Sequence, residues 1–157
     1  MRFQVTVSVA APASTVWNLA GDPPRWPGLT ESTTRAAWVR GDGVAVGNRA
    51  RVAQPRLGEN LWEVTEVSPG VRWAWRTSRP GLKTVATHEV RKVAPGHAEL
   101  TLGIDQSGPL APLVGLLMGG RARHYVELEA AGLKRGAEAA PDDQSQSVRS
   151  PGLQPRA

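Results

Sequence analysis

The chain contains no cysteine, a single phenylalanine, a single tyrosine and no long apolar run. The lack of cysteine excludes disulfide bridges, thiolate nucleophiles and cysteine-ligated metals. The longest apolar run, residues 110–118, has nine residues and contains Pro112 and Gly115. A membrane-spanning helix needs about 20 apolar residues, so we expect no transmembrane segment.

The N-terminus also lacks the features of a secretory signal. Polar and apolar residues alternate strictly from Arg2 to Val9, whereas a signal peptide needs a continuous apolar stretch. We therefore expect a cytoplasmic protein.

Lysine is scarce as well, with 3 residues against 16 arginines, and the formal net charge is +5. Nucleic-acid binding needs basic residues gathered on one face, with stacking aromatic residues among them. Here the arginines between residues 35 and 91 are mostly single and alternate with apolar neighbours. This pattern indicates a solvated outer sheet face, and we expect no nucleic-acid partner.

The hydrophobic periodicity predicts one strand, two short helical segments, six further strands and a long helix. The first strand covers residues 2–10, a short helix begins within 11–14, and a second helical turn surrounds Trp26. Turns rich in Gly, Pro and Asp separate the later segments. The six later strands are 32–40, 47–54, 60–67, 71–78, 82–93 and 97–107.

From Pro112 to about Gly136 the apolar residues follow a helical period. The residues that mark this helix are Leu113, Leu116, Leu117, Tyr125, Leu128 and Ala131. We expect a kink at residues 119–120, because each of these two glycines costs a helix about 1 kcal/mol relative to alanine. The polar tail, 139–157, cannot bury enough apolar surface to offset its ordering entropy, so we predict that it is disordered.

Consecutive strands on short connections form an antiparallel meander rather than parallel βαβ units. A seven-stranded antiparallel sheet twists and curls, and one terminal helix covers its concave face without filling it. The sequence therefore predicts an α+β protein in which a curved sheet wraps around a long C-terminal helix. The remaining space is either a packed core or a ligand cavity.

Short motifs occur along the chain in a defined order and spacing. They are Ala11-Pro12 with Val16-Trp17, Asp22-Pro23 with Arg25-Trp26-Pro27, residues 46–52 and 62–66, Pro69-Gly70, Trp73-Ala74-Trp75, residues 86–90 and the 106–110 junction. Together they resemble the START-like (SRPBCC) superfamily, more specifically its polyketide cyclase/dehydrase and lipid-transport branch. The resemblance covers residues 1–138 and implies a helix-grip domain with a deep cavity between sheet and helix. It implies no particular reaction, because members include binders, transporters and cyclases.

Tryptophan residues are the first candidates for a binding site. Trp73 and Trp75 lie two residues apart on one strand, so their indoles point to the same face, and Trp62 is expected to join them from the neighbouring strand. They form either core packing or the flat wall of an aromatic-ligand pocket. The excess of six tryptophans over one phenylalanine favours the pocket, because phenylalanine suffices for a dry core.

Polar candidates are fewer. His88 lies on an apolar strand face and is either a satisfied core residue or, if it faces a cavity, the best general acid/base candidate. Tyr125 is the second catalytic candidate. Arg121 lies four residues before Tyr125, so the two share a helix face, while Gln54 and Gln106 either bind a ligand or cap the sheet.

The sequence has no metal-ligand spacing, phosphate-binding loop or Gly-x-Ser-x-Gly motif, so we expect no metal and no cofactor. The leading hypothesis is a protein that binds a small hydrophobic or polyaromatic molecule, polyketide-like or lipid-like, in an internal cavity. One alternative is a cyclase or dehydratase that confines a polyketide-type substrate beside one acid/base residue, His88 or Tyr125. Another is a protein-interaction or stress-related module with a vestigial pocket, which predicts an exposed apolar patch near residues 119–120. The oligomeric state is left open.

Overall fold

The computed structural model describes residues 1–141. The tail predicted to be disordered, 139–157, therefore lies outside the described residues apart from its first three positions. The elements, in chain order, are β1 (Arg2–Val9), α1 (Ala13–Ala20), the 3₁₀ helix η1 (Pro23–Gly28), β2 (Arg35–Arg40), β3 (Arg49–Gln54), β4 (Gly58–Ser68), β5 (Arg72–Arg79), β6 (Leu82–Ala94), β7 (His97–Ser107) and α2 (Ala111–Ala139).

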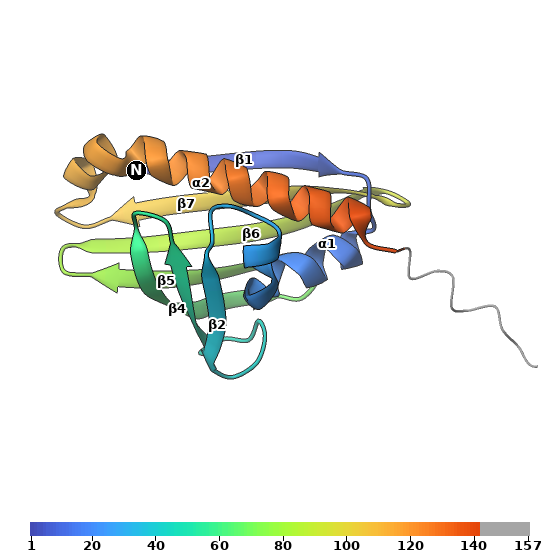
Figure 1. Ribbon diagram of the computed structural model, residues 1–157, viewed down its shortest axis with the longest axis horizontal. Helices are drawn as coiled ribbons and strands as arrows, with labels where there is room; N and C mark the ends of the chain where they lie inside the picture. Colours follow the sequence, from blue (N-terminus) through green and yellow to red (C-terminus); the bar gives the residue numbers. More distant parts are fainter. Residues whose placement is uncertain (142–157) are drawn as a thin grey trace, which may run out of the picture.

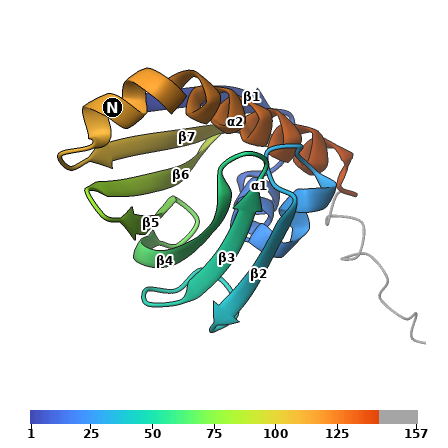
Figure 2. The same cartoon turned by 60° about the vertical axis from the view of Figure 1, so that its left-hand side comes forward.

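The seven strands form one antiparallel sheet in the order β1-β7-β6-β5-β4-β3-β2. Strands β2 to β7 pair with their neighbours in the chain, and β1 closes against β7. Irregularities in register interrupt β2, β4 and β6, and such bulges increase the local twist of a strand. Figures 1 and 2 show the sheet curving around α2, which lies along its concave side. The predicted fold class is confirmed.

The long helix is anchored by its C-terminal half. The buried residues of α2 are Ala111, Val126, Ala130, Gly132, Leu133 and Ala137, so all but the first lie beyond residue 125. These side chains are small or medium in size, which lets the helix approach α1 and η1 closely. None of the helices in residues 1–141 has the length and apolarity needed to cross a membrane.

Gly132 is the point of closest approach between α2 and the segment that follows η1. A Cβ atom added at Gly132 would lie 2.8 Å from the Thr30 Cβ and even closer to the Leu29 carbonyl group. Gly120, in the same helix, has no neighbouring atom within 4 Å of an added Cβ. The helix runs unbroken through residues 119–120, so the two glycines that weaken its backbone do not interrupt it.

We predict opposite effects of alanine at these two positions on the free energy of unfolding. Gly132→Ala should destabilise the protein by about 1–3 kcal/mol, because the methyl group forces the helix away from Leu29. Gly120→Ala should stabilise it by up to about 1 kcal/mol through helix propensity alone. Urea unfolding followed by circular dichroism measures both values, and equal effects at the two positions would contradict this packing.

Candidate functional site

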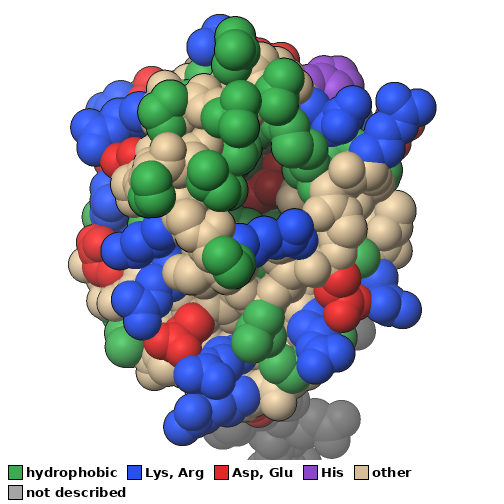
Figure 3. All heavy atoms as spheres, turned by 90° about the vertical axis from the view of Figure 1, so that its left-hand side faces the viewer, with side chains coloured by type: hydrophobic (Ala, Val, Ile, Leu, Met, Phe, Trp, Pro, Cys, Tyr) green, Lys and Arg blue, Asp and Glu red, His purple; other side chains and the backbone are tan. Residues whose placement is uncertain are grey.

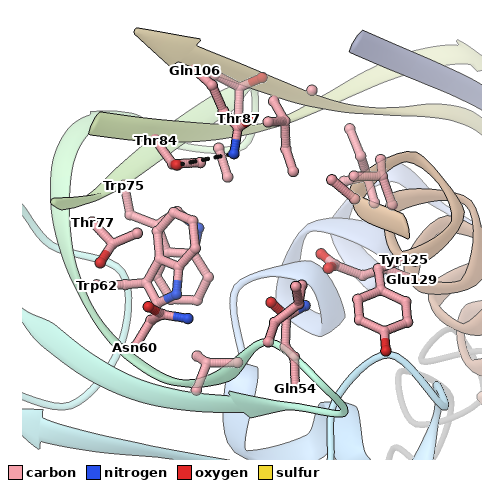
Figure 4. Close-up of a pocket in the computed structure, with 18 of the residues that line it drawn as sticks. Gln54, Asn60, Trp62, Trp75, Thr77, Thr84, Thr87, Gln106, Tyr125 and Glu129 are labelled. Atoms are coloured by element: carbon pink, nitrogen blue, oxygen red, sulfur yellow. Dashed lines mark hydrogen bonds between the residues drawn. The ribbon is translucent and has the colours of Figure 1, made fainter. Parts of the chain in front are cut away.

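A cavity lies between the concave face of the sheet and α2, and it encloses about 180 Å³. Its lining comes from Trp26 of η1, from strands β3 to β7 and from four successive turns of α2. Most of this lining is apolar, and the polar groups are concentrated at a few places. Figure 4 shows the labelled side chains converging on the cavity from the strands on one side and from α2 on the other.

Tryptophans form one wall of the cavity. The indoles of Trp62 and Trp75 are stacked, with ring centroids 5.1 Å apart and an interplanar angle of 29°. Trp73 meets Trp75 edge-on at 5.0 Å but lies behind the wall, where none of its surface is exposed. Stacked and edge-to-face pairs are the preferred aromatic geometries, so these contacts hold the wall rigid.

His88 lies at the base of the cavity, within the same aromatic cluster. Its imidazole stacks on Trp73 at 4.0 Å with an interplanar angle of 3°, and Trp26 lies 5.5 Å away on a tilted plane. The Nε2 atom lies 3.1 Å from the Oε1 atom of Glu129 on α2. Because a carboxylate only accepts hydrogen bonds, Nε2 donates in this pair. The His88 Nδ1 atom is buried without a hydrogen-bond partner among the described residues.

Besides His88, two lining residues keep a buried polar atom without a hydrogen-bond partner in residues 1–141, namely Trp62 at Nε1 and Gln106 at Oε1. The Gln106 amide nitrogen donates to the Thr84 hydroxyl at 3.4 Å, the contact drawn as a dashed line in Figure 4. An unsatisfied buried polar group costs about 1–3 kcal/mol, and native proteins contain few of them. A ligand with matching polar groups would offset that cost.

Tyr125 joins the two sides of the cavity. Its hydroxyl donates a hydrogen bond to the carbonyl oxygen of Pro55, in the turn between β3 and β4. The next residue, Arg56, has a positive φ of 61°, a conformation that favours glycine and costs other residues about 1 kcal/mol or more. The contact therefore holds a strained turn against the helix at the edge of the cavity.

The structure brings most of the predicted site residues together. Those that line the cavity are Gln54, Trp62, Trp75, His88, Gln106 and Tyr125. Trp73 supports the lining through its contact with His88, whereas Arg121 is exposed on α2 and does not line the cavity. The described residues contain no cluster of three or more potential metal-ligating side chains.

Several lining residues were not predicted from the sequence, although the helical and strand periods place them on the inner face. Glu129 follows Tyr125 by four positions and thus shares its helix face. Thr84 lies two strand periods before His88, and Thr77 lies one period after Trp75, so both share a face with a predicted residue. The periodicity of the sequence could have indicated these three residues. They were not selected because threonine and glutamate side chains are usually exposed to solvent.

An antiparallel sheet that grips a C-terminal helix over an apolar cavity defines the helix-grip class of folds. The family model described as polyketide cyclase/dehydrase and lipid transport matches residues 1–138. The chain therefore belongs to this family, and the resemblance predicted from the sequence motifs is confirmed. No curated protein sequence matches the chain.

Solved structures share the fold at low sequence identity. A START superfamily protein from Mycobacterium smegmatis has a TM-score of 0.67 at 16% identity, with 85% of this chain and 97% of that one covered. The di-domain ARO/CYC BexL from the BE-7585A biosynthetic pathway has the same TM-score and identity, with 85% of this chain but 46% of BexL covered. A hypothetical protein from Helicobacter pylori has a TM-score of 0.70 at 16% identity, with 87% and 86% covered. At this level of sequence identity, the similarities show a shared fold and no shared function.

We predict that Glu129→Ala destabilises the protein by about 1–3 kcal/mol, because the buried His88 N–H loses its acceptor. Glu127→Ala is the matched control: it makes the same chemical change on the same helix at an exposed position, and it should alter stability by no more than about 0.5 kcal/mol. Both values are measured by urea unfolding. Similar values for the two variants would show that the Glu129–His88 contact contributes nothing.

Proposed function

We propose that the protein binds a small, planar and largely apolar molecule in the cavity beneath α2. The observation that carries the proposal is the combination of a stacked tryptophan wall with three buried, unpaired polar atoms in the lining, at Trp62, His88 and Gln106. The apolar wall supplies most of the binding free energy, and the unpaired atoms fix the orientation of the ligand. The family description, which joins polyketide chemistry to lipid transport, is consistent with such a ligand.

The size of the cavity limits the ligand. An engineered protein cavity of about 150 Å³ binds benzene, and sites for drug-sized molecules enclose about 300–1,000 Å³. At about 180 Å³, this cavity fits a ligand of one or two rings or part of an acyl chain. A larger polyketide requires the Tyr125–Pro55 contact to open.

The polar atoms limit the ligand further. The indole N–H of Trp62 only donates hydrogen bonds, so it selects an acceptor such as a ketone or a phenol oxygen. A site built around an unpaired donor discriminates against an analogue that lacks the acceptor. The class of ligand supported best is therefore an aromatic ketone or phenol rather than a pure hydrocarbon.

Calorimetric titration with α-tetralone and tetralin tests this proposal, because the two probes differ by one ketone oxygen. The wild-type protein should bind α-tetralone about fivefold more tightly, which corresponds to one net hydrogen bond of about 1 kcal/mol. Trp62→Phe should abolish this preference, whereas Trp38→Phe, outside the lining, should retain it. Ala122→Leu, which fills the cavity, should weaken both probes, and binding unaffected by Ala122→Leu would contradict the location of the site.

A second candidate function, cyclisation of a poly-β-ketone, is favoured by the buried His88–Glu129 pair in the cavity. In such a reaction a base takes a proton from the carbon between two ketones, and that carbon attacks another ketone carbon. The resulting alkoxide takes up a proton, and loss of water then completes the ring. Confinement selects which carbons meet, and His88 is the candidate base.

Product analysis by liquid chromatography and mass spectrometry tests the enzymatic candidate with a linear poly-β-ketone thioester. The wild-type protein should enrich one cyclised isomer over the spontaneous mixture. His88→Gln and Tyr125→Phe should return the mixture to the spontaneous ratio, while His97→Gln, at the exposed start of β7, should not. A wild-type mixture identical to the protein-free mixture would reject catalysis and leave the binding proposal intact.

A further inference from the structure

Four exposed leucines lie at the start of α2, and the cavity does not account for them. Leu116 is 83% exposed, Leu117 is 73% exposed, and Leu110 and Leu113 are 45% and 54% exposed. We refer to these four residues as the leucine patch. Burying one leucine is worth about 1.5–3 kcal/mol, so a helix ordinarily turns such residues inward. A cluster that faces outward marks a contact surface.

The leucine patch borders the mouth of the cavity. Val114 and Met118, from the same helix turns, line the cavity. The backbone N–H of Leu110 donates to the Gly81 carbonyl in the β5–β6 turn at 2.9 Å, and the adjacent Leu82 is also part of the lining. Figure 3 shows apolar side chains gathered around a hollow at this end of the molecule. The exposed apolar surface is therefore continuous with the cavity.

The basic residues near the leucine patch differ from most arginines on the outer sheet face. Most arginines on the outer sheet face are paired with carboxylates, as in the Arg35–Glu59, Arg49–Glu63 and Arg72–Glu66 contacts. Arg40 on β2 and Lys92 on β6 have no carboxylate within 4.0 Å in the described residues. Five basic residues on the elements that border the mouth have no carboxylate within 4.0 Å in residues 1–141. They are Arg56 in the β3–β4 turn, Arg79 and Lys83 at the β5–β6 turn, and Arg121 and Arg123 on α2. Figure 3 shows basic side chains beside the apolar ones.

The shape of the leucine patch and the charge around it indicate which kind of partner binds there. A second copy of the chain would bring the two sets of unpaired basic residues together, and like charges in an interface cost several kcal/mol. A protein partner that accepts leucines side by side needs a matching groove for them. The acyl layer of a membrane needs no such match, and it suits Leu116 and Leu117 because they protrude.

We propose that the leucine patch inserts into an anionic lipid membrane, with the five basic side chains against the lipid phosphates. Each basic residue near such a surface contributes about 1 kcal/mol, and the inserted leucines add the burial of apolar area. In this orientation the cavity mouth faces the bilayer, so an apolar ligand enters without crossing water. The docking itself does not depend on which ligand the cavity holds.

Vesicle flotation tests the proposal with the full-length protein. Vesicles of phosphatidylcholine alone are compared with vesicles that contain one quarter phosphatidylglycerol, each at low and high salt. The wild-type protein should float with the anionic vesicles at low salt, and this binding should weaken at least about tenfold in high salt as the charges are screened. Binding to the neutral vesicles should be weak under both conditions.

Matched double variants identify the surface responsible. Leu116→Ser/Leu117→Ser should reduce anionic-vesicle binding at least about tenfold, whereas Val71→Ser/Val93→Ser, at the opposite end of the sheet, should not. Lys83→Glu/Arg121→Glu should reduce binding to a similar extent. Arg40→Glu/Lys92→Glu carries the same change in net charge away from the mouth and should have a much smaller effect. Circular dichroism confirms folding, and tetralone titration shows whether the cavity is intact.

Several results would overturn the proposal. Failure of the wild-type protein to bind anionic vesicles at low salt is one, and equal effects of the patch and control variants is another. Light scattering that shows a dimer, dissociated by Leu116→Ser/Leu117→Ser, would assign the patch to a second copy instead. A monomer that binds no vesicles would leave the patch to a protein partner and also reject the proposal. Intact tetralone binding in each case separates these failures from failure of the proposed ligand site.

Discussion

Gly132 allows α2 to pack closely on the segment after η1. This packing determines where the cavity and the leucine patch lie. Two hydrogen bonds strengthen this anchor: Lys134 Nζ donates to the Ser8 carbonyl at 2.6 Å, and the Ala10 N–H donates to the Glu138 carboxylate at 2.9 Å. Because the C-terminal half of α2 is held in this way, the N-terminal half extends over the open side of the sheet. The cavity lies beneath that half, and the leucine patch lies on its outer side.

The buried nitrogen atoms that lack hydrogen-bond partners are difficult to explain by stability alone. Trp62, Trp73 and His88 each bury a nitrogen without a partner in the described chain, and each such atom costs about 1–3 kcal/mol. Phenylalanine would fill the same space without that cost, yet the chain has six tryptophans and one phenylalanine. A ligand in the cavity can offset this cost for Trp62 and His88, which line it, but not for Trp73, which lies behind the wall.

The fold was predictable because strand alternation, turn residues and the change to a helical period are local signals. The site was predictable only in part. Alternation placed Trp73 and Trp75 on one face, and Trp62 was expected to join them from the neighbouring strand. In the structure Trp73 stacks on His88 and supports the wall instead of lining the cavity. Glu129 reaches His88 across 41 positions of sequence, and no local pattern indicates that contact. Leu113, Leu116 and Leu117, which mark the helical period in the sequence, are exposed, because only the C-terminal part of α2 packs on α1 and the segment after η1.

The part of α2 that covers the cavity includes the helix turns that carry the leucine patch. Val114, Met118 and Ala122 face the cavity, and Tyr125 forms the polar contact that closes its edge at Pro55. If a larger ligand enters by movement of this part of the helix, the Tyr125–Pro55 contact breaks at a cost of about 1 kcal/mol. A surface that binds the leucine patch acts on the same part of the helix. If the cavity binds a ligand and the leucine patch docks as proposed, both events act on the same helix, whose C-terminal half is fixed by its packing at Gly132.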